Sequence, residues 1–236
     1  LKDCYDFTSR GQDLLRRVDE SEKLVVAKMD GLALGGGLEI ALSADVIVAT
    51  PKAVIGLPET GIGIYPGLGG TQRTSRVIGK ELAKYLIFTG RLISAAEAHA
   101  IGIVDYVFSP AEIEEKLREL IAEGKLAPDK GKKPEELPPD WRRLRELFRD
   151  ENIEAWLSGQ FLDSEDPLEA KTAGTIAANA PLALKLANQI IDEGMDLPLR
   201  EATKLELDQL IEIFSTADAL TGLSNVGKKG IQFEGR

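Results

Sequence analysis

Apolar and polar positions alternate at short intervals along the first half of the chain. Residues 5–18 have the spacing of an amphipathic helix, and brief β-branched runs that each end at a turn follow them. We expect the buried side of the opening helix to carry Phe7, Leu14, Leu15 and Val18. The strands that we expect are residues 24–29, 45–50, 53–56 and 103–108.

Glycines and capping residues locate the helices between these strands. The three glycines at 35–37 are unsuited to a helix interior, but they suit a loop that opens directly into a helix, here 36–43. Ser94 is placed as the N-cap of a short helix. Two further helices are expected to begin near Thr71 and Lys80.

The pattern changes after residue 110. A charged amphipathic helix at 111–125 is followed by a proline-rich, charged stretch at 128–140, which we interpret as a linker or surface excursion. The helices expected beyond it are 141–149, 153–158, 168–179, 181–193 and 198–216. Strands alternating with helices, and then helices alone, predict an α/β fold with an appended helical region, divided into 1–125 and 126–236.

Composition narrows the possible chemistry. A formal net charge of −10 disfavours nucleic acid and anionic membranes as partners, because both would repel the protein. One cysteine and one histidine exclude an internal disulfide and a Cys/His zinc site, so we expect no metal centre. His99 lies in an alanine-rich helical stretch and is interpreted as structural, which leaves proton transfer mostly to carboxylates. Without a signal-peptide pattern or an apolar run of about 20 residues, the protein is expected to be cytoplasmic.

The first candidate site is the segment GGGLE at residues 35–39. Backbone N–H groups at such a helix start can bind a phosphate or stabilise an oxyanion that develops during a reaction. Glu39 would repel a phosphate there, whereas an oxyanion beside a general base tolerates a carboxylate. Taken alone, the segment fits equally well with a glycine turn whose glutamate is favoured by the helix dipole.

The second candidate site is LPETGIGIYPGLGGTQR at residues 57–73. Glu59 follows a predicted strand and faces a glycine-rich loop, and on local evidence it is a surface turn residue. The segment 67–71 lacks the spacing and the lysine of a phosphate-binding loop, and we interpret it as a close-packed loop that leads into the next helix.

Together these segments are far more specific than either alone. ALGGGLE, ADVIVAT, GLPETGIGIYPGLGGTQR and TGRLISAAEAHAIGIVDYV follow one another in an order that resembles the crotonase superfamily over residues 26–108. The resemblance implies the spiral α/β fold of that family and assigns an oxyanion-hole amide to Gly36. It assigns the two acid–base carboxylates to Glu39 and Glu59, and substrate contacts to Gly67 and Lys228. Lys228 is equally well explained as a solvated lysine.

The activity implied by the resemblance is that of an enoyl-CoA hydratase, which adds water across the 2,3 double bond of 2-enoyl-CoA thioesters in fatty-acid β-oxidation. Coenzyme A would be part of the substrate, and no separate cofactor is expected. Relatives imply a homotrimer or hexamer, with the C-terminal helices covering the acyl pocket. The alternatives are an enoyl-CoA isomerase, another acyl-CoA enzyme of the family, or a catalytically incomplete chain retained for assembly.

The chain departs from the family pattern in two places, and each departure leads to a further expectation. The resemblance implies that the chain starts downstream of a strand-rich segment, which would supply the second oxyanion-hole amide and most of the coenzyme A loop. The stretch 125–166 is longer than in simple hydratases and resembles the hydratase part of prokaryotic fusions with a 3-hydroxyacyl-CoA dehydrogenase.

Overall fold

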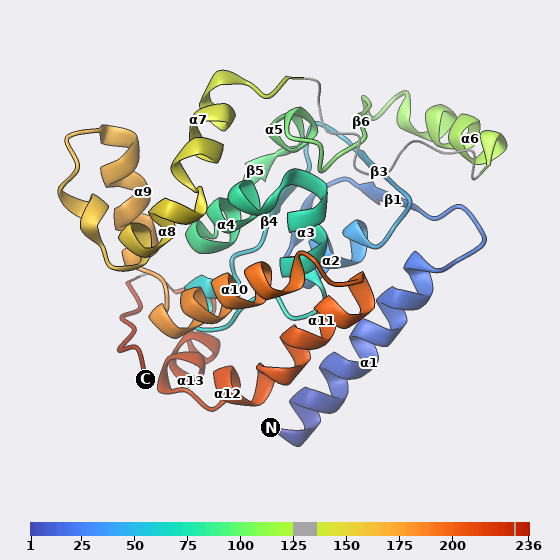
Figure 1. The fold of residues 1–236 in the computed structure, drawn as a ribbon. Helices are drawn as coiled ribbons and strands as arrows, with labels where there is room; N and C mark the ends of the chain where they lie inside the picture. Colours follow the sequence, from blue (N-terminus) through green and yellow to red (C-terminus); the bar gives the residue numbers. More distant parts are fainter. Residues whose placement is uncertain (125–135, 229) are drawn as a thin grey trace.

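The computed structural model describes residues 1–124, 136–228 and 230–236. Its strands form two small sheets that the helices surround (Figure 1). The linker predicted at 128–140 and the insertion predicted at 125–166 lie partly outside the described residues.

Each sheet has three short strands. The strand order of the first is β1-β3-β6, all parallel, and that of the second is β2-β4-β5, with β4 parallel to β2 and antiparallel to β5. The bounds are β1 Val26–Met29, β2 Leu32–Leu34, β3 Val46–Ala49, β4 Val54–Gly56, β5 Ile93–Ser94 and β6 Tyr106–Val107. The sequence pattern missed β2 and β5, because runs of three and two residues are too short to show alternation.

Helices make up most of the remainder. In the strand-containing half they are α1 Lys2–Asp19, α2 Gly36–Leu42, α3 Gly70–Ile78, α4 Lys80–Thr89, α5 Ala95–Ala100 and α6 Ile113–Glu123. The later helices are α7 Pro139–Leu147, α8 Asp150–Leu157, α9 Pro167–Ala177, α10 Pro181–Gly194, α11 Leu199–Asp208, α12 Leu210–Phe214 and α13 Ala217–Ser224. Two 3₁₀ turns, η1 Glu59–Ile62 and η2 Gln160–Asp163, complete the set. The N-cap predicted at Ser94 is confirmed, with Glu97 completing a capping box.

Helix α1 buries only part of the face that was predicted. Phe7 and Leu14 are 73% and 58% exposed, so their assignment to the buried side was wrong. Leu15 is buried as predicted, and Thr8 is buried beside it. Gln12, on the same side, donates hydrogen bonds to the 67–71 loop and to α11. Hydrophobicity failed as a guide here, because a small residue and a hydrogen-bonding amide make much of this contact.

The helix predicted at 198–216 is in fact two helices. It is interrupted at Gln209, so that α11 ends at Asp208 and α12 begins at Leu210. The hydroxyl of Tyr65 donates to the backbone carbonyl of Glu206 at 2.6 Å and thereby satisfies an acceptor in the last turn of α11.

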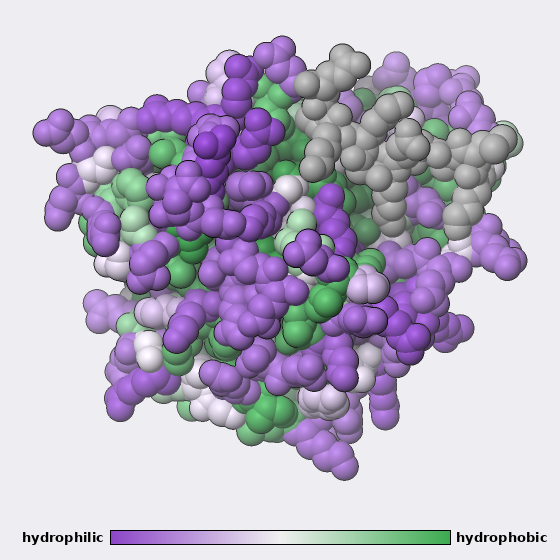
Figure 2. Space-filling view, in the orientation of Figure 1, coloured by the Kyte–Doolittle hydropathy of each residue, from purple (hydrophilic) through white to green (hydrophobic). Residues whose placement is uncertain are grey.

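A single hydrophobic core contains residues of both predicted regions. Phe148 contacts Tyr85 and Phe88 of α4 on one side, and it stacks on Trp156 of α8 on the other. On the face drawn in Figure 2, hydrophilic residues predominate and apolar residues form small separate groups. Within the described parts of the chain, no helix is long and apolar enough to cross a membrane.

Candidate active site

Glu39 and Glu59 follow two neighbouring parallel strands. Strand β2 leads into α2, of which Glu39 is the fourth residue, and β4 leads into η1, which begins at Glu59. Leu34 pairs with Gly56 at the ends of these strands. Because the carboxyl ends of parallel strands lie at one edge of a sheet, segments that are distant in sequence come together there.

Gly35 brings the second carboxylate next to the start of α2. Its φ of +52° lies in the region that favours glycine, and its N–H donates to the carbonyl of Gly56 at 2.9 Å. A β-carbon at Gly35 would lie only 2.6 Å from Oε1 of Glu59. The Glu59 carboxylate therefore packs directly on the backbone that leads into Gly36.

The glycine-rich loop holds the carboxylate of Glu39. The N–H groups of Leu68 and Gly70 both donate to Glu39 Oε1, at 2.7 and 2.8 Å. The other oxygen, Oε2, lies on the Gly36 side, 4.0 Å from the position of an added β-carbon on Gly36. One oxygen of Glu39 is thus fixed by two amides, while the other faces the first turn of α2.

Burial changes the acidity of both carboxyls. Glu39 is 2% exposed and Glu59 8%. Burial raises the pKa of Glu39, although the N–H groups of Gly70 and Leu68 oppose the shift. Burial also raises the pKa of Glu59, and the neighbouring charge of Glu39 raises it further. Two carboxyls that disfavour each other's ionisation titrate as a pair, so one proton on the pair is favoured near neutral pH.

One buried oxygen of Glu59 is available to form a further hydrogen bond. Its Oε2 atom finds no hydrogen-bond partner among the described residues. A buried acceptor left without a donor is costly, so this atom is suited to bind a water or a substrate atom. A protonated Glu59 could also donate from this position.

The other predicted site residues lie in different settings. Gly36 opens α2, where first-turn N–H groups have no partner within the helix. Gly67 belongs to the loop that holds Glu39, and its carbonyl accepts from the Gln12 side chain at 2.8 Å. Lys228 is exposed, and its described contact is with Asn225, at 2.9 Å. The structure thus gathers Gly36, Glu39, Glu59 and the loop, and describes no contact between Lys228 and them.

Sequence reasoning missed a third buried carboxylate, Glu206 of α11. It is fully buried and accepts hydrogen bonds from Gly69 and Thr71 of the same loop. It shares a helix face with Ala202, four residues earlier and also fully buried, but nothing in the local sequence pattern shows that burial. Within the described residues, no group of three or more His, Cys, Asp or Glu side chains could hold a metal ion.

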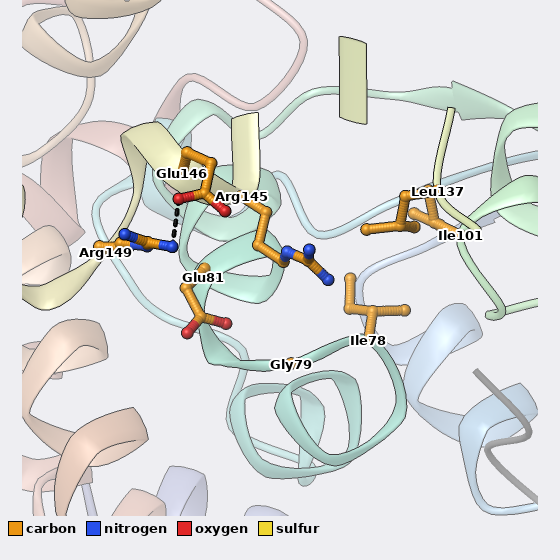
Figure 3. Close-up of a pocket in the computed structure, with 8 residues that line it drawn as sticks. All are labelled: Ile78, Gly79, Glu81, Ile101, Leu137, Arg145, Glu146 and Arg149. Atoms are coloured by element: carbon orange, nitrogen blue, oxygen red, sulfur yellow. Dashed lines mark ion pairs between the residues drawn. The ribbon is translucent and has the colours of Figure 1, made fainter. Parts of the chain in front are cut away.

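A separate cavity of about 330 Å³ lies between the start of α4 and α7. Figure 3 shows Arg145 reaching across it towards Ile78, while Glu146 forms an ion pair with Arg149. Neither Glu39 nor Glu59 lines this cavity.

Comparisons with known proteins agree on one family. Residues 2–130 match the model of the enoyl-CoA hydratase/isomerase family. The chain is 35% identical to a short-chain-enoyl-CoA hydratase of Clostridium acetobutylicum, over 88% of this chain and 60% of that protein. It is 31% identical to a crotonyl-CoA hydratase of Syntrophomonas wolfei, over 94% of this chain and 65% of that protein. The chain therefore spans less than two thirds of either relative.

Solved structures show the same fold. An enoyl-CoA hydratase of Rhodobacter sphaeroides superposes with a TM-score of 0.78 at 24% identity, over 95% of this chain and 66% of that one. A carnitinyl-CoA dehydratase of Mycobacterium thermoresistibile superposes with a TM-score of 0.74. These likenesses confirm the crotonase-like α/β fold expected from the motifs. Taken with the match to the family model, they show that the chain belongs to the enoyl-CoA hydratase/isomerase family.

Proposed function

We propose that this chain carries the acid–base residues of an enoyl-CoA hydratase. The observation that carries the proposal is the pair of buried carboxylates beside the start of α2, one held by two loop amides and the other with an unpartnered oxygen. The hydratases named among its relatives support the same reaction. The substrate class would be 2-enoyl-CoA thioesters.

The proposed reaction uses Glu39 in its ionised form and Glu59 in its protonated form. Ionised Glu39 takes a proton from water while the water oxygen bonds to C3 of the enoyl group. Electrons of the double bond move towards the thioester oxygen, and the Gly36 N–H stabilises the resulting enolate; one such donor contributes about 3 kcal/mol. Protonated Glu59 then gives its proton to C2. Water is added across the bond, and the pair still carries one proton.

Substitution of each carboxylate tests the proposal. Glu39→Gln and Glu59→Gln are assayed separately for hydration of crotonyl-CoA, with Glu146→Gln in the exposed ion pair of α7 as the matched control. Hydration by Glu39→Gln at nearly the wild-type rate would rule out the two-carboxylate mechanism. Loss of hydration with retained double-bond isomerisation would favour the isomerase alternative.

Because the chain spans less than two thirds of its hydratase relatives, a second assay is needed. Crotonyl-CoA turnover is measured for this chain alone and for a version that restores any coding sequence preceding Leu1. Activity in the extended version alone would assign the chain as an incomplete hydratase. Inactivity of both would favour a role in assembly.

The substrate contacts, the oligomeric state and a fusion partner can be proposed as well. We propose that coenzyme A enters only as part of the substrate, and that Gly67 and Lys228 contact the substrate. We further propose a cytoplasmic homotrimer or hexamer, whose helical region 126–236 covers the acyl pocket, and a covalent link to a 3-hydroxyacyl-CoA dehydrogenase. Light scattering tests the oligomer, and the coding sequence beyond Arg236 tests the link.

A further inference from the structure

Glu206 binds the glycine-rich loop from the side opposite to Glu39. Its Oε2 accepts from the Gly69 N–H at 2.6 Å and from the Gln12 side chain at 3.3 Å. Its Oε1 accepts from the N–H and the hydroxyl of Thr71, at 3.2 and 2.5 Å. Helix α11 thus anchors the loop through a carboxylate that is fully buried.

Successive amides of this loop point to two different carboxylates. Leu68 and Gly70 donate to Glu39, whereas Gly69 and Thr71 donate to Glu206. The two acids therefore hold opposite sides of the same four-residue segment. A shift of the segment away from Glu206 would also move the two N–H groups that fix Glu39.

The two glycines at the centre of the loop have no side chains to hold their amides in position. Gly69 has a φ of +96°, and a β-carbon there would lie 1.7 Å from an Arg73 nitrogen. A β-carbon on Gly70 would lie 2.7 Å from Glu39 Oε1. Both positions therefore favour glycine and contribute no side-chain packing, so hydrogen bonds must determine where the amides lie.

We propose that Glu206 is a positioning residue, which fixes the 67–71 loop so that Leu68 and Gly70 hold one oxygen of Glu39 and leave the other directed at the reaction site. The inference rests on the proposed hydratase function. Glu206 itself touches neither water nor substrate in this scheme. An enzyme group misplaced by about 1 Å can lose about 100-fold in rate, so a loop shift should lower kcat.

A double-mutant cycle with Glu39 tests this role. Glu206→Gln replaces one acceptor oxygen with an NH2 group, which cannot accept from a loop N–H, and it should lower kcat on crotonyl-CoA on the order of 10- to 100-fold, with KM changed less than about threefold. In a Glu39→Gln background the same substitution should have almost no further effect. An equal proportional loss in both backgrounds, or no loss in the wild-type background, would overturn the proposal.

Two variants separate positioning from general destabilisation. Lys84→Met removes another fully buried charge, on α4, and should leave kcat near the wild-type value. If Lys84→Met lowers kcat as much as Glu206→Gln does, Glu206 has only a structural role. Thr71→Val removes a single hydroxyl donor to Glu206, and it can be used if Glu206→Gln fails to fold. We expect kcat to fall several-fold. An unchanged kcat would contradict the proposal.

An NMR measurement distinguishes this proposal from the hydratase proposal itself. In ¹⁵N spectra, Glu206→Gln should shift the backbone amide signals of Leu68 and Gly70, whereas Lys84→Met should leave them in place. Unshifted signals would refute the positioning role whether or not the protein is active. Shifted signals, together with inactivity of both the wild-type chain and its extended version, would refute the hydratase function and retain the structural link between Glu206 and the Glu39 amides.

Discussion

Leu68 lies over Gly36, with its Cδ1 atom 3.6 Å from the place where a β-carbon of Gly36 would be. The same residue donates its N–H to Glu39 at 2.7 Å. The side chain of Leu68 therefore occupies space between the proposed oxyanion amide and α1, where its Cδ2 atom would lie 2.6 Å from a β-carbon of Gly11. Under the proposed function, an acyl group bound at Gly36 would lie beside this side chain.

Leu68→Ala should therefore widen the range of accepted acyl groups. We expect kcat/KM for an eight- or ten-carbon enoyl-CoA to rise relative to that for crotonyl-CoA by about 10-fold, corresponding to one or two methylene groups of accessible space. The backbone N–H to Glu39 is retained, so turnover of crotonyl-CoA should fall little. The measurement is a series of kcat/KM values over chain length. An unchanged ratio would place the acyl chain elsewhere.

Removal of either candidate carboxyl, Glu39 or Glu59, should lower kcat without lowering stability. Glu39→Gln and Glu59→Gln should each lower kcat by about 10²- to 10⁴-fold, because each removes one proton-transfer group. Stability should be retained or increased, since a buried ionisable group is replaced by a neutral one of the same size. Thermal unfolding measured beside the kinetics tests this combination. A large fall in Tm would show that loss of activity comes from loss of structure.

The raised pKa values of the buried carboxyls predict how stability depends on pH. Burial, together with the charge of Glu39, raises the pKa of Glu206 to about 8, and the pKa values of Glu39 and Glu59 are raised as well. A carboxyl with a higher pKa in the folded state binds its proton more tightly there. Its contribution to stability is therefore complete below the unfolded pKa and is lost as the pH rises through the folded value.

Tm should consequently fall between about pH 5 and pH 9. Carboxyls whose pKa is lowered, such as Glu97 and Asp150, act in the opposite direction but only at more acidic pH. Calorimetry at constant ionic strength measures the slope, and Glu59→Gln should reduce it. A Tm that rises over this range would contradict the raised values.

The sequence predicted the two-carboxylate site from the order and spacing of its glycine-rich segments taken together, because neither acid is distinctive alone. It also placed most helices, since their periodicity and caps are local signals. Glu206 could not be found in this way. It is 137 residues from Gly69, and in the charged helix α11 it looks like any solvent-facing glutamate. Its burial depends on how α11 packs over the loop, which no local pattern encodes.

Gly70 is the position in the loop where a methyl group should press on the Glu39 carboxylate. A β-carbon there would lie 2.7 Å from both Glu39 Oε1 and the Pro66 side chain. We expect Gly70→Ala to cost about 1–3 kcal/mol of stability and to lower kcat about 100-fold as Glu39 is displaced. Urea unfolding and crotonyl-CoA kinetics give the two values.

The matched control is Gly174→Ala in α9. No atom lies within 4 Å of a β-carbon at Gly174, and the residue is inside a helix. This substitution should raise stability by about 0.5–1 kcal/mol, because alanine loses less backbone entropy in a helix than glycine. Equal effects of the two substitutions would contradict the crowding described around Gly70.

The face of α1 that packs on the protein can be tested in the same way. Leu15 is 4% exposed, whereas Phe7, which has the larger apolar side chain, is 73% exposed. Leu15→Ala should therefore cost about 2–5 kcal/mol in urea unfolding, and Phe7→Ala should change stability by less than about 0.5 kcal/mol. The larger loss reflects both lost burial and the cavity left between α1 and its neighbours. If Phe7→Ala cost as much as Leu15→Ala, Phe7 would have to be packed against the protein as the sequence first suggested.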